Sequence, residues 1–169
     1  KNMIRQLKSG KITETDQIKA LSRIKRTLRI EDLGACDLII EAATEDEKIK
    51  QEIFDKLLPH LSQHTILTSN TSSISITRLA SRTDRPEKFL GFHFMNPVPV
   101  MQLVELIRGI ATDQETYDIC RTVVGTLGKT AASAEDFPAF IVNRILMPMI
   151  NEAVYTLYEG VGSVQSIDK

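Results

Sequence analysis

Residues 37–47 read DLIIEAATEDE, an apolar run followed at once by a polar segment. A short continuous apolar run is typical of a strand in a parallel sheet, because helices cover both faces of such a sheet. In the polar segment, Thr44 as N-cap and Glu47 three positions later match a capping box, so a helix should begin here. The stretch therefore predicts a strand that leads into a helix, the repeating unit of an α/β fold.

The helix predicted after Thr44 carries one apolar stripe, which should face the sheet. Strands and helices alternate along the following residues as well, and this alternation predicts a doubly wound α/β sheet. The stripe consists of Ile49, Ile53, Phe54, Leu57, Leu58 and Leu61. The other predicted strands are residues 26–30, 65–68, 88–94, 101–107 and 129–133. The other predicted helices are residues 1–8, residues 13–24, a helix that begins at Ile76, and a helix that begins with a capping box at Thr112 and ends at Gly128.

The pattern changes after Glu135. Between Val142 and Leu157, apolar residues recur at helical spacing, which predicts a long and largely buried helix. A further helix is expected within residues 163–169. We therefore place a domain boundary near Glu135, with residues 1–135 in the sheet domain and residues 136–169 at the start of a helical domain.

The composition is that of a soluble globular protein: 42% of residues are hydrophobic, 25% are charged, and 21 Lys and Arg balance 22 Asp and Glu. This balance leaves no basic surplus for nucleic-acid binding. No apolar run approaches the about 18 to 20 residues of a membrane span, and the first residues are polar, unlike a signal peptide. We therefore expect no nucleic-acid or membrane partner, and a cytoplasmic protein or, in a eukaryote, one of an organelle matrix.

Residues that form disulfides or metal sites are few and widely spaced. Cys36 and Cys120 lie 84 positions apart in patterned segments, so buried thiols are expected rather than a disulfide. The three histidines match no metal-binding spacing. We predict that the protein holds no metal.

The glycine-rich motif of a dinucleotide-binding sheet, G-x-G-x-x-G between the first strand and helix, is absent from the sequence. The one Gly-x-Gly pair, Gly160 and Gly162, follows a predicted helix and has Gln165 in the place of the third glycine. If the sheet binds a dinucleotide, we expect the chain to be a segment that lacks a first βαβ unit of about 30 residues.

Four segments of the chain, in their order and spacing, resemble the short-chain L-3-hydroxyacyl-CoA and 3-hydroxybutyryl-CoA dehydrogenases. The resemblance covers nearly the whole chain. It departs from the family at Ala139, where the family usually has glycine after the proline; this change should tighten the hinge before the last long helix. The four segments are Glu41–Glu45, Ser69–Ser73, Gly91–Pro99 together with Leu103–Glu105, and Phe140–Arg144.

The resemblance implies an oxidoreductase that transfers a hydride from an L-3-hydroxyacyl-CoA, such as 3-hydroxybutyryl-CoA, to NAD and yields the 3-ketoacyl-CoA. It implies a Rossmann-like NAD-binding domain, here N-terminally incomplete, followed by the start of an all-helical domain through which the family forms homodimers. It also implies the site residues. His93 and Glu105 are catalytic; Ser72, Asn143 and Lys8 contact the acyl-CoA substrate; Glu45, Lys50, Ser72 and Asn96 bind the cofactor.

The chemistry of this reaction suits these residue types. Oxidation of a secondary alcohol requires removal of its hydroxyl proton, and a neutral imidazole is well suited to take it. A nearby carboxylate fixes the imidazole tautomer and stabilises the imidazolium that forms. His93 ends one predicted strand and Glu105 lies on the next, so antiparallel pairing of the strands should place them within hydrogen-bond reach. Ser72 and Asn143 should lie in the same cleft.

Other interpretations of these residues stay open. Ser69–Ser73 also suits a helix-capping turn, and Glu45 and Lys50 also suit a helix-dipole carboxylate and a solvent-facing lysine. The alternative functions are a dehydrogenase of the same fold that acts on a small hydroxy acid or sugar acid, and a non-catalytic dimerising or CoA-binding protein. The sequence leaves open the acyl-chain length and the choice between NAD and NADP.

Overall fold

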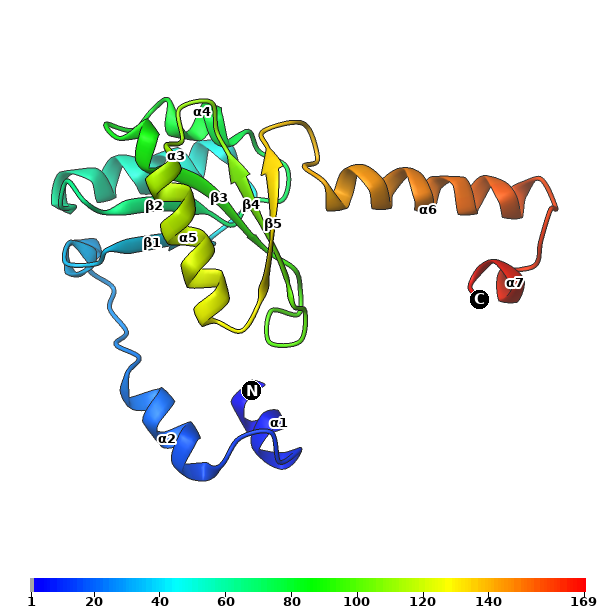
Figure 1. Ribbon diagram of the computed structural model, residues 1–169, viewed down its shortest axis with the longest axis horizontal. Coiled ribbons are helices and arrows are strands. Elements are labelled where there is room, and N and C mark those ends of the chain that lie inside the picture. Colours follow the sequence, from blue (N-terminus) through cyan, green and yellow to red (C-terminus); the bar gives the residue numbers. More distant parts are fainter. Residues whose placement is uncertain (1) are drawn as a thin grey trace.

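The computed structural model describes residues 2–169, and its centre is a five-stranded sheet with the order β1-β2-β3-β4-β5 (Figure 1). The first three strands are parallel, β4 is antiparallel to β3, and β5 is parallel to β4. The predicted α/β sheet is confirmed, and every strand predicted from residue 37 onward is present within one or two residues of its expected bounds. The strands are β1 (Leu38–Glu41), β2 (Ile66–Ser69), β3 (Phe89–Phe94), β4 (Leu103–Arg108) and β5 (Thr130–Glu135).

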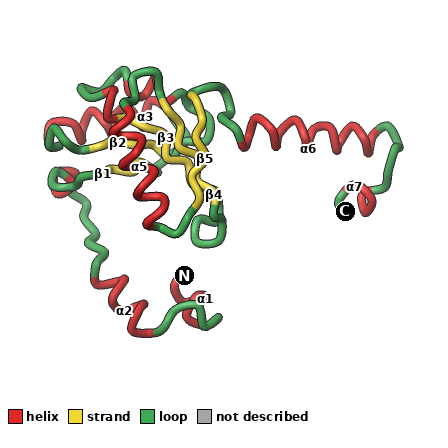
Figure 2. The backbone as a smooth tube through the Cα atoms, in the orientation of Figure 1, coloured by secondary structure: helices red, strands yellow, loops and turns green. Residues whose placement is uncertain are grey.

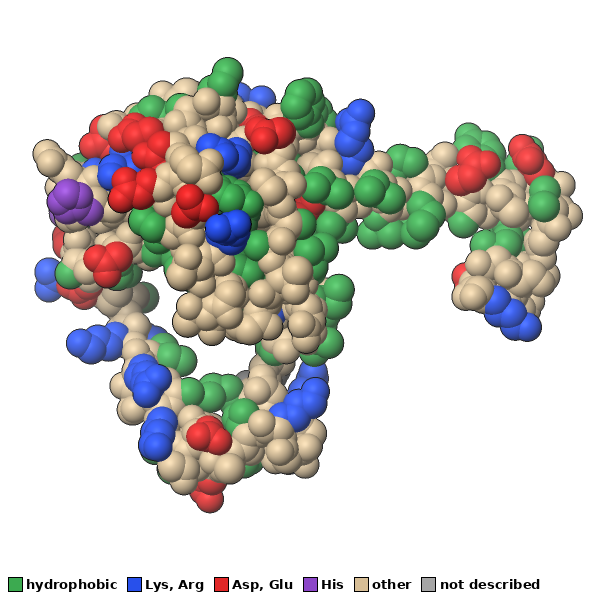
Figure 3. Space-filling model, viewed as in Figure 1, with side chains coloured by type: hydrophobic (Ala, Val, Ile, Leu, Met, Phe, Trp, Pro, Cys, Tyr) green, Lys and Arg blue, Asp and Glu red, His purple; other side chains and the backbone are tan. Residues whose placement is uncertain are grey.

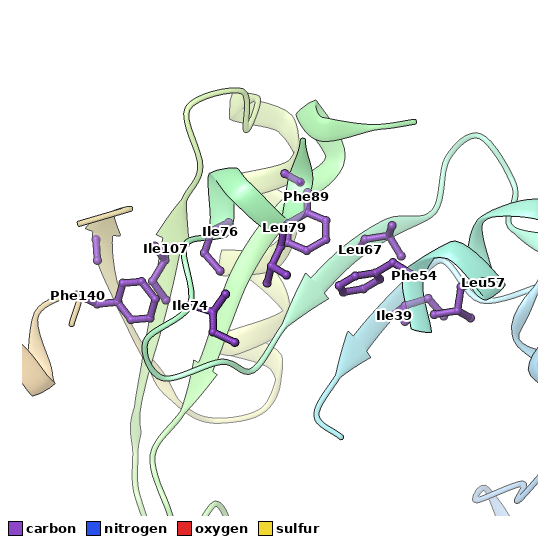
Figure 4. Packing of buried hydrophobic residues seen from close by; sticks show 12 residues of the cluster. Ile39, Phe54, Leu57, Leu67, Ile74, Ile76, Leu79, Phe89, Ile107 and Phe140 are labelled. Carbon is purple, nitrogen blue, oxygen red and sulfur yellow. The ribbon is translucent and has the colours of Figure 1, made fainter. Parts of the chain in front are cut away.

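Helices cover both faces of the sheet: α3 (Glu47–Leu57) and α4 (Ile76–Ala80) pack on one face and α5 (Gln114–Thr126) on the other (Figure 2). Because successive side chains of a strand point to opposite faces, the strands supply two separate cores. The core beneath α3 and α4 contains Ile39, Phe54, Leu57, Leu67, Ile74, Ile76, Leu79, Phe89, Ile107 and Phe140 (Figure 4). The core beneath α5 contains Ile66, Leu90, Phe92, Val104, Leu106, Cys120 and Val124.

One glycine lets α4 approach the sheet. A Cβ on Gly91 of β3 would lie 2.8 Å from the Cβ of Ile107 and 2.9 Å from the Cδ1 of Ile76, so no larger residue fits without moving the helix. Side chains on a strand alternate between the faces, so His93 lies on the same face as Gly91. The histidine therefore projects on the side of the sheet that α4 and the following loops cover.

Two predicted capping boxes are wrong by one or two residues. The N-cap of α3 is Asp46, whose side chain accepts from the backbone N–H of Ile49, and not Thr44. The N-cap of α5 is Asp113 and not Thr112. The Thr112 hydroxyl is already engaged, because it donates to the Phe89 carbonyl and accepts from the Gly109 amide.

The buried face of α3 contains most of the predicted apolar stripe and, in addition, Lys50. Lys50, Phe54 and Leu57 are its buried residues, whereas Ile49 is 45% exposed. Ile53 is partly buried against the same core, and the Lys50 ammonium donates to the Glu41 carboxylate inside the fold. An ion pair inside the fold is a feature that hydrophobic periodicity does not contain.

The strand predicted at residues 26–30 is wrong. These residues are irregular up to a short 3-10 helix at Ile30–Leu33, and the Leu28 side chain is fully exposed. A strand needs a hydrogen-bonded neighbour, and no strand among residues 2–169 pairs with this segment.

The helices at the two ends of the chain extend away from the sheet (Figure 1). At one end, α1 (Asn2–Lys8) and α2 (Glu14–Ser22) form a hairpin, and Thr13 and Asp16 make the capping box of α2. At the other end are α6 (Val142–Tyr158) and the short α7 (Val164–Ile167). The helix after Glu135 is confirmed, but its predicted burial is wrong. No residue of α6 is buried, and apolar side chains are exposed along it (Figure 3).

The cysteines are free thiols, as predicted, with Cys120 buried and Cys36 half-buried. Burial raises the pKa of the Cys120 thiol to about 12, so this group is a core residue rather than a nucleophile. Between residues 2 and 169 no helix has both the length and the apolar character needed to cross a bilayer.

Candidate active site

The pair His93 and Glu105 is the centre of the site. The two residues are register partners on the antiparallel strands β3 and β4. Nδ1 of His93 lies 2.8 Å from Oε2 of Glu105, which confirms the predicted hydrogen-bond reach. His93 is 6% exposed and Glu105 is fully buried. A hydrogen-bonded pair on adjacent strands, shielded from water, has a fixed geometry.

The second carboxylate oxygen of Glu105 holds the start of α6. Oε1 accepts hydrogen bonds from the backbone amides of Ile141 and Val142, each at 2.9 Å. The helix has no capping side chain of its own at Ile141, so a residue 36 positions earlier in the chain caps it. One carboxylate therefore fixes both the imidazole and the segment that leads out of the sheet.

Glu105 is ionised in spite of its burial. Burial acts to raise the pKa of its carboxyl, but the hydrogen bonds from His93, Val142 and Ile141 together hold that pKa below its ordinary value. An ionised carboxylate only accepts hydrogen bonds, so Nδ1 of His93 carries the proton in this pair. In the neutral ring Nε2 then has the free lone pair, which makes it the nitrogen able to accept a proton.

Ser72 and Asn143 meet although they come from distant parts of the chain. The Nδ2 amide of Asn143, in the first turn of α6, donates to the backbone carbonyl of Ser72 at 3.3 Å. Asn143 directly follows Val142, whose amide binds Glu105. The loop after β2 and the start of α6 are thus joined beside the His93 and Glu105 pair.

Glu45 fixes the loop that carries Ser72. Its Oε1 atom accepts from the Thr71 hydroxyl at 2.6 Å, the Ser72 amide at 2.7 Å and the Ser73 amide at 3.1 Å. Burial acts to raise the pKa of this carboxyl, but the bonds from Thr71, Ser72 and Ser73 and the charge of Lys50 hold the pKa below its ordinary value. Glu45 thus holds the loop of Thr71–Ser73 by hydrogen bonds, whereas Asp46 is the N-cap of α3.

Lys50 is buried, so the alternative interpretation of it as a solvent-facing lysine is wrong. Its Nζ lies 2.6 Å from Oε2 of Glu41, and the two side chains are each 2% exposed. The same ammonium lies 3.9 Å from Oε2 of Glu45.

Asn96 and Lys8 are exposed and lie outside these networks. Asn96 lies in the loop between β3 and β4, and Lys8 ends α1. A cavity of about 330 Å³ separates α1 from this loop, and Lys8 does not line it. Its basic lining residues are Arg5 and Lys11, neither of which was predicted from the sequence as a contact. The remaining lining residues are Asn2, Gln6, Ser9, Pro97, Pro99 and Val100.

Three further residues of the site region were not selected from the sequence. Asn70 accepts from the Phe94 amide at 2.8 Å and joins the ends of β2 and β3. Asp136 accepts from the Ser75 hydroxyl and from the first amides of α4, although it lies about 60 positions away. The third is Glu41, for which the sequence did carry a signal, an acidic residue inside an apolar run with a lysine nine positions later.

No cluster of three or more His, Cys, Asp or Glu suited to a metal occurs within residues 2–169.

Two family models match the chain. The NAD binding domain of 3-hydroxyacyl-CoA dehydrogenase matches residues 1–137, and the C-terminal domain of 3-hydroxyacyl-CoA dehydrogenase matches residues 140–169. The chain is 59% identical over 167 residues to a 3-hydroxybutyryl-CoA dehydrogenase of Bradyrhizobium diazoefficiens, which is 99% of this chain and 57% of that protein. It is 46% identical over 169 residues to a probable 3-hydroxybutyryl-CoA dehydrogenase of Bacillus subtilis, covering 59% of that protein.

A solved structure has the same fold. The (S)-3-hydroxybutyryl-CoA dehydrogenase PaaH1 from Ralstonia eutropha superposes with a TM-score of 0.93 at 46% identity, over 98% of this chain and 58% of that one. The chain thus spans somewhat more than half the length of the relatives it matches. On the match of its family models and the likeness of its fold, the chain belongs to the 3-hydroxyacyl-CoA dehydrogenase family.

Proposed function

We propose that this chain carries the catalytic residues of an NAD-dependent dehydrogenase that oxidises an L-3-hydroxyacyl-CoA, with 3-hydroxybutyryl-CoA as a short-chain substrate, to the 3-ketoacyl-CoA. The observation that carries the proposal is the buried hydrogen bond between His93 and the ionised Glu105. The names of the relatives support the substrate class.

The residues near the strand ends fit a dinucleotide. The strands β1, β2 and β3 are parallel, so their carboxyl ends meet at one edge, where open α/β sheets bind ligands. Glu45, Ser72 and Asn96 follow these strands and offer carboxylate, hydroxyl and amide groups, which suit the hydroxyls and carboxamide of a nicotinamide nucleoside. When bound, NAD supplies the hydride acceptor. Lys50, whose ammonium lies 3.9 Å from Glu45, is proposed as the fourth cofactor-binding residue of this set.

His93 is the proposed general base. Its Nε2 takes the proton of the substrate hydroxyl, and the charge of Glu105 stabilises the imidazolium that results. Ser72 and Asn143 are proposed to hold the reacting end of the substrate, a role that their mutual contact supports. Lys8 is proposed as a contact to the CoA nucleotide, with the neighbouring Arg5 and Lys11 adding positive charge.

The remaining proposals concern organisation. We place the domain boundary at Glu135, where β5 ends, with an NAD-binding domain at residues 1–135 and a helical domain from residue 136. A homodimer through the helical domain is supported by the exposed apolar side chains of α6, because a large uncovered apolar face favours association. A cytoplasmic location is supported by the two free cysteines.

The test is substrate specificity in the full-length protein. NADH formation is followed with L-3-hydroxybutyryl-CoA and with free 3-hydroxybutyrate, and NADPH formation is followed when NADP replaces NAD. Turnover of the CoA thioester with NAD is the expected result. Equal turnover of the free acid would favour a dehydrogenase of small hydroxy acids, and no turnover of either would favour a non-catalytic protein.

A further inference from the structure

The loop between β3 and β4 belongs to both halves of the proposed site. Asn96, a proposed cofactor contact, lies in this loop, and Pro97, Pro99 and Val100 line the cavity that separates it from α1. The Pro97 carbonyl accepts from the amides of Val100 at 2.9 Å and Met101 at 3.0 Å, so the loop contains a tight turn. Because Val100 is 68% exposed and Met101 is 41% exposed, burial of apolar side chains contributes little to holding this turn in place.

Lys129 binds the loop from the start of the neighbouring strand β5. Its Nζ lies 2.6 Å from the carbonyl oxygen of Val98 and 2.7 Å from the carbonyl oxygen of Met101. An ammonium has three donors, so it can bind two carbonyls at once. Hydrogen bonds from a charged donor are about twice as strong as those between neutral groups. Lys129 therefore ties both sides of the turn to β5.

The backbone around Lys129 directs its side chain at the loop. α5 ends in a Schellman motif, in which the amides of Gly128 and Lys129 donate to carbonyls of the last helical turn. Gly128 has a φ of 68°, the left-handed conformation that this motif requires. The next residue, Thr130, donates to the Gln102 carbonyl at 2.9 Å and begins β5 beside the loop (Figure 1). A helix end and a strand start thus fix the Lys129 backbone from both sides.

We propose that Lys129 is a positioning residue that holds the loop between β3 and β4 in the conformation that binds the substrate and the cofactor. Without the ammonium the turn at Val98–Met101 shifts, and it moves both Asn96 and the wall of the cavity next to α1. His93 and Glu105 keep their geometry, because strand register rather than the loop holds them. The inference rests on the proposed function, since it concerns the same acyl-CoA and cofactor site.

The test is Lys129→Met in the full-length protein, which removes both hydrogen bonds and keeps most of the side-chain volume. The KM for L-3-hydroxybutyryl-CoA and the Kd of NAD⁺ should each rise about tenfold, the effect of losing one hydrogen bond of a charged group. The kcat should change much less, because the base and its partner stay in place. Lys129→Arg keeps the charge and the donors and should recover most of both affinities.

Hydrogen exchange reports on the loop directly. The amides of Val100 and Met101 donate within the turn, so they should exchange faster in Lys129→Met than in the wild type. The matched control is Lys56→Met, at an exposed lysine of α3, which should leave the exchange, the KM and the Kd at their wild-type values. Should Lys129→Met not fold, Lys129→Gln keeps a neutral donor, and smaller rises in the same quantities are expected.

The competing explanation is a direct contact of Lys129 with the phosphates of CoA. The Kd of NAD⁺, measured by titration calorimetry without acyl-CoA, separates the two explanations. Loss of a contact with CoA leaves this Kd unchanged, whereas a displaced Asn96 raises it.

Three results would overturn the inference. The first is wild-type exchange of the two turn amides in Lys129→Met. The second is faster exchange with wild-type KM and Kd, and the third is a raised KM with a wild-type Kd of NAD⁺. A wild-type protein that does not turn over the acyl-CoA would instead contradict the proposed function, and the exchange experiment would still decide whether Lys129 holds the loop.

Discussion

Nδ1 of His93 lies 2.8 Å from Oε2 of Glu105, and the other oxygen of the same carboxylate binds the first amides of α6. The proposed base is therefore oriented by a group that also joins the sheet to the helical segment. A change at Glu105 should affect both proton transfer and the attachment of α6, and the two effects can be measured separately.

The first prediction concerns the base itself. In the full-length protein, His93→Gln should lower kcat by about 10² to 10⁴, the usual contribution of a positioned general base. The KM for the acyl-CoA should change much less, because the base acts in the transition state. Steady-state kinetics measures both, and His64→Gln, at an exposed histidine, is the control. Near-normal kcat in His93→Gln would mean that His93 is a buried structural residue and not the base.

The second prediction concerns the partner of the base. Glu105→Gln should lower kcat at the lower end of that range of about 10² to 10⁴, because His93 keeps a neutral neighbour but loses the charge that stabilises its protonated form. The losses should not add in the double variant, since both changes disable one unit. Additive losses in the kinetics of the three variants would mean that the residues act independently.

The third prediction concerns pH and stability. The pKa of Glu105 lies below its ordinary value of 4.5, and the pKa values of Glu45 and Asp136 are lowered as well. Where the folded-state pKa is depressed, the stabilisation is present above the unfolded-state pKa and is lost as the pH falls through the folded-state pKa. The free energy of unfolding should thus fall as the pH drops below about 4.5.

Chemical denaturation over a pH series tests this. Glu105→Gln has no group to protonate at that position, so its stability should fall less steeply in acid than that of the wild type. An identical pH dependence in the two proteins would show that Glu105 contributes nothing to it.

The fourth prediction concerns the hinge before α6. Ala139 has a φ of 68°, in the left-handed region that favours glycine. Ala139→Gly removes a strain of about 1 to 2 kcal/mol from the folded state. The added flexibility of glycine stabilises the unfolded state entropically by about 0.4 to 1 kcal/mol, so a net stabilisation of the folded protein by about 0.5 kcal/mol is expected. Thermal unfolding measures the change. The control Ala153→Gly, inside α6, should destabilise the protein by about 1 kcal/mol. A destabilised Ala139→Gly would mean that the alanine is not strained.

Local patterns in the sequence were enough to predict several elements of the fold. The apolar run at residues 38–41, the strand that contains His93 and the helix from Ile76 were predicted because period and turn residues act over a few positions. The pairing of His93 with Glu105 followed from the resemblance and from two neighbouring strands that the loop between them makes antiparallel. The polar loop with Ser72 was also found in this way.

Tertiary structure decided how groups far apart in the sequence share their charges and hydrogen bonds. Thr112 cannot cap α5 because the Phe89 carbonyl takes its hydroxyl, and Lys50 is buried because Glu41 lies beneath it. The start of α6 has no local cap because Glu105, 36 positions earlier, provides one. A buried polar group must find a partner, and which partner it finds depends on the packing of the whole fold rather than on its neighbours in sequence.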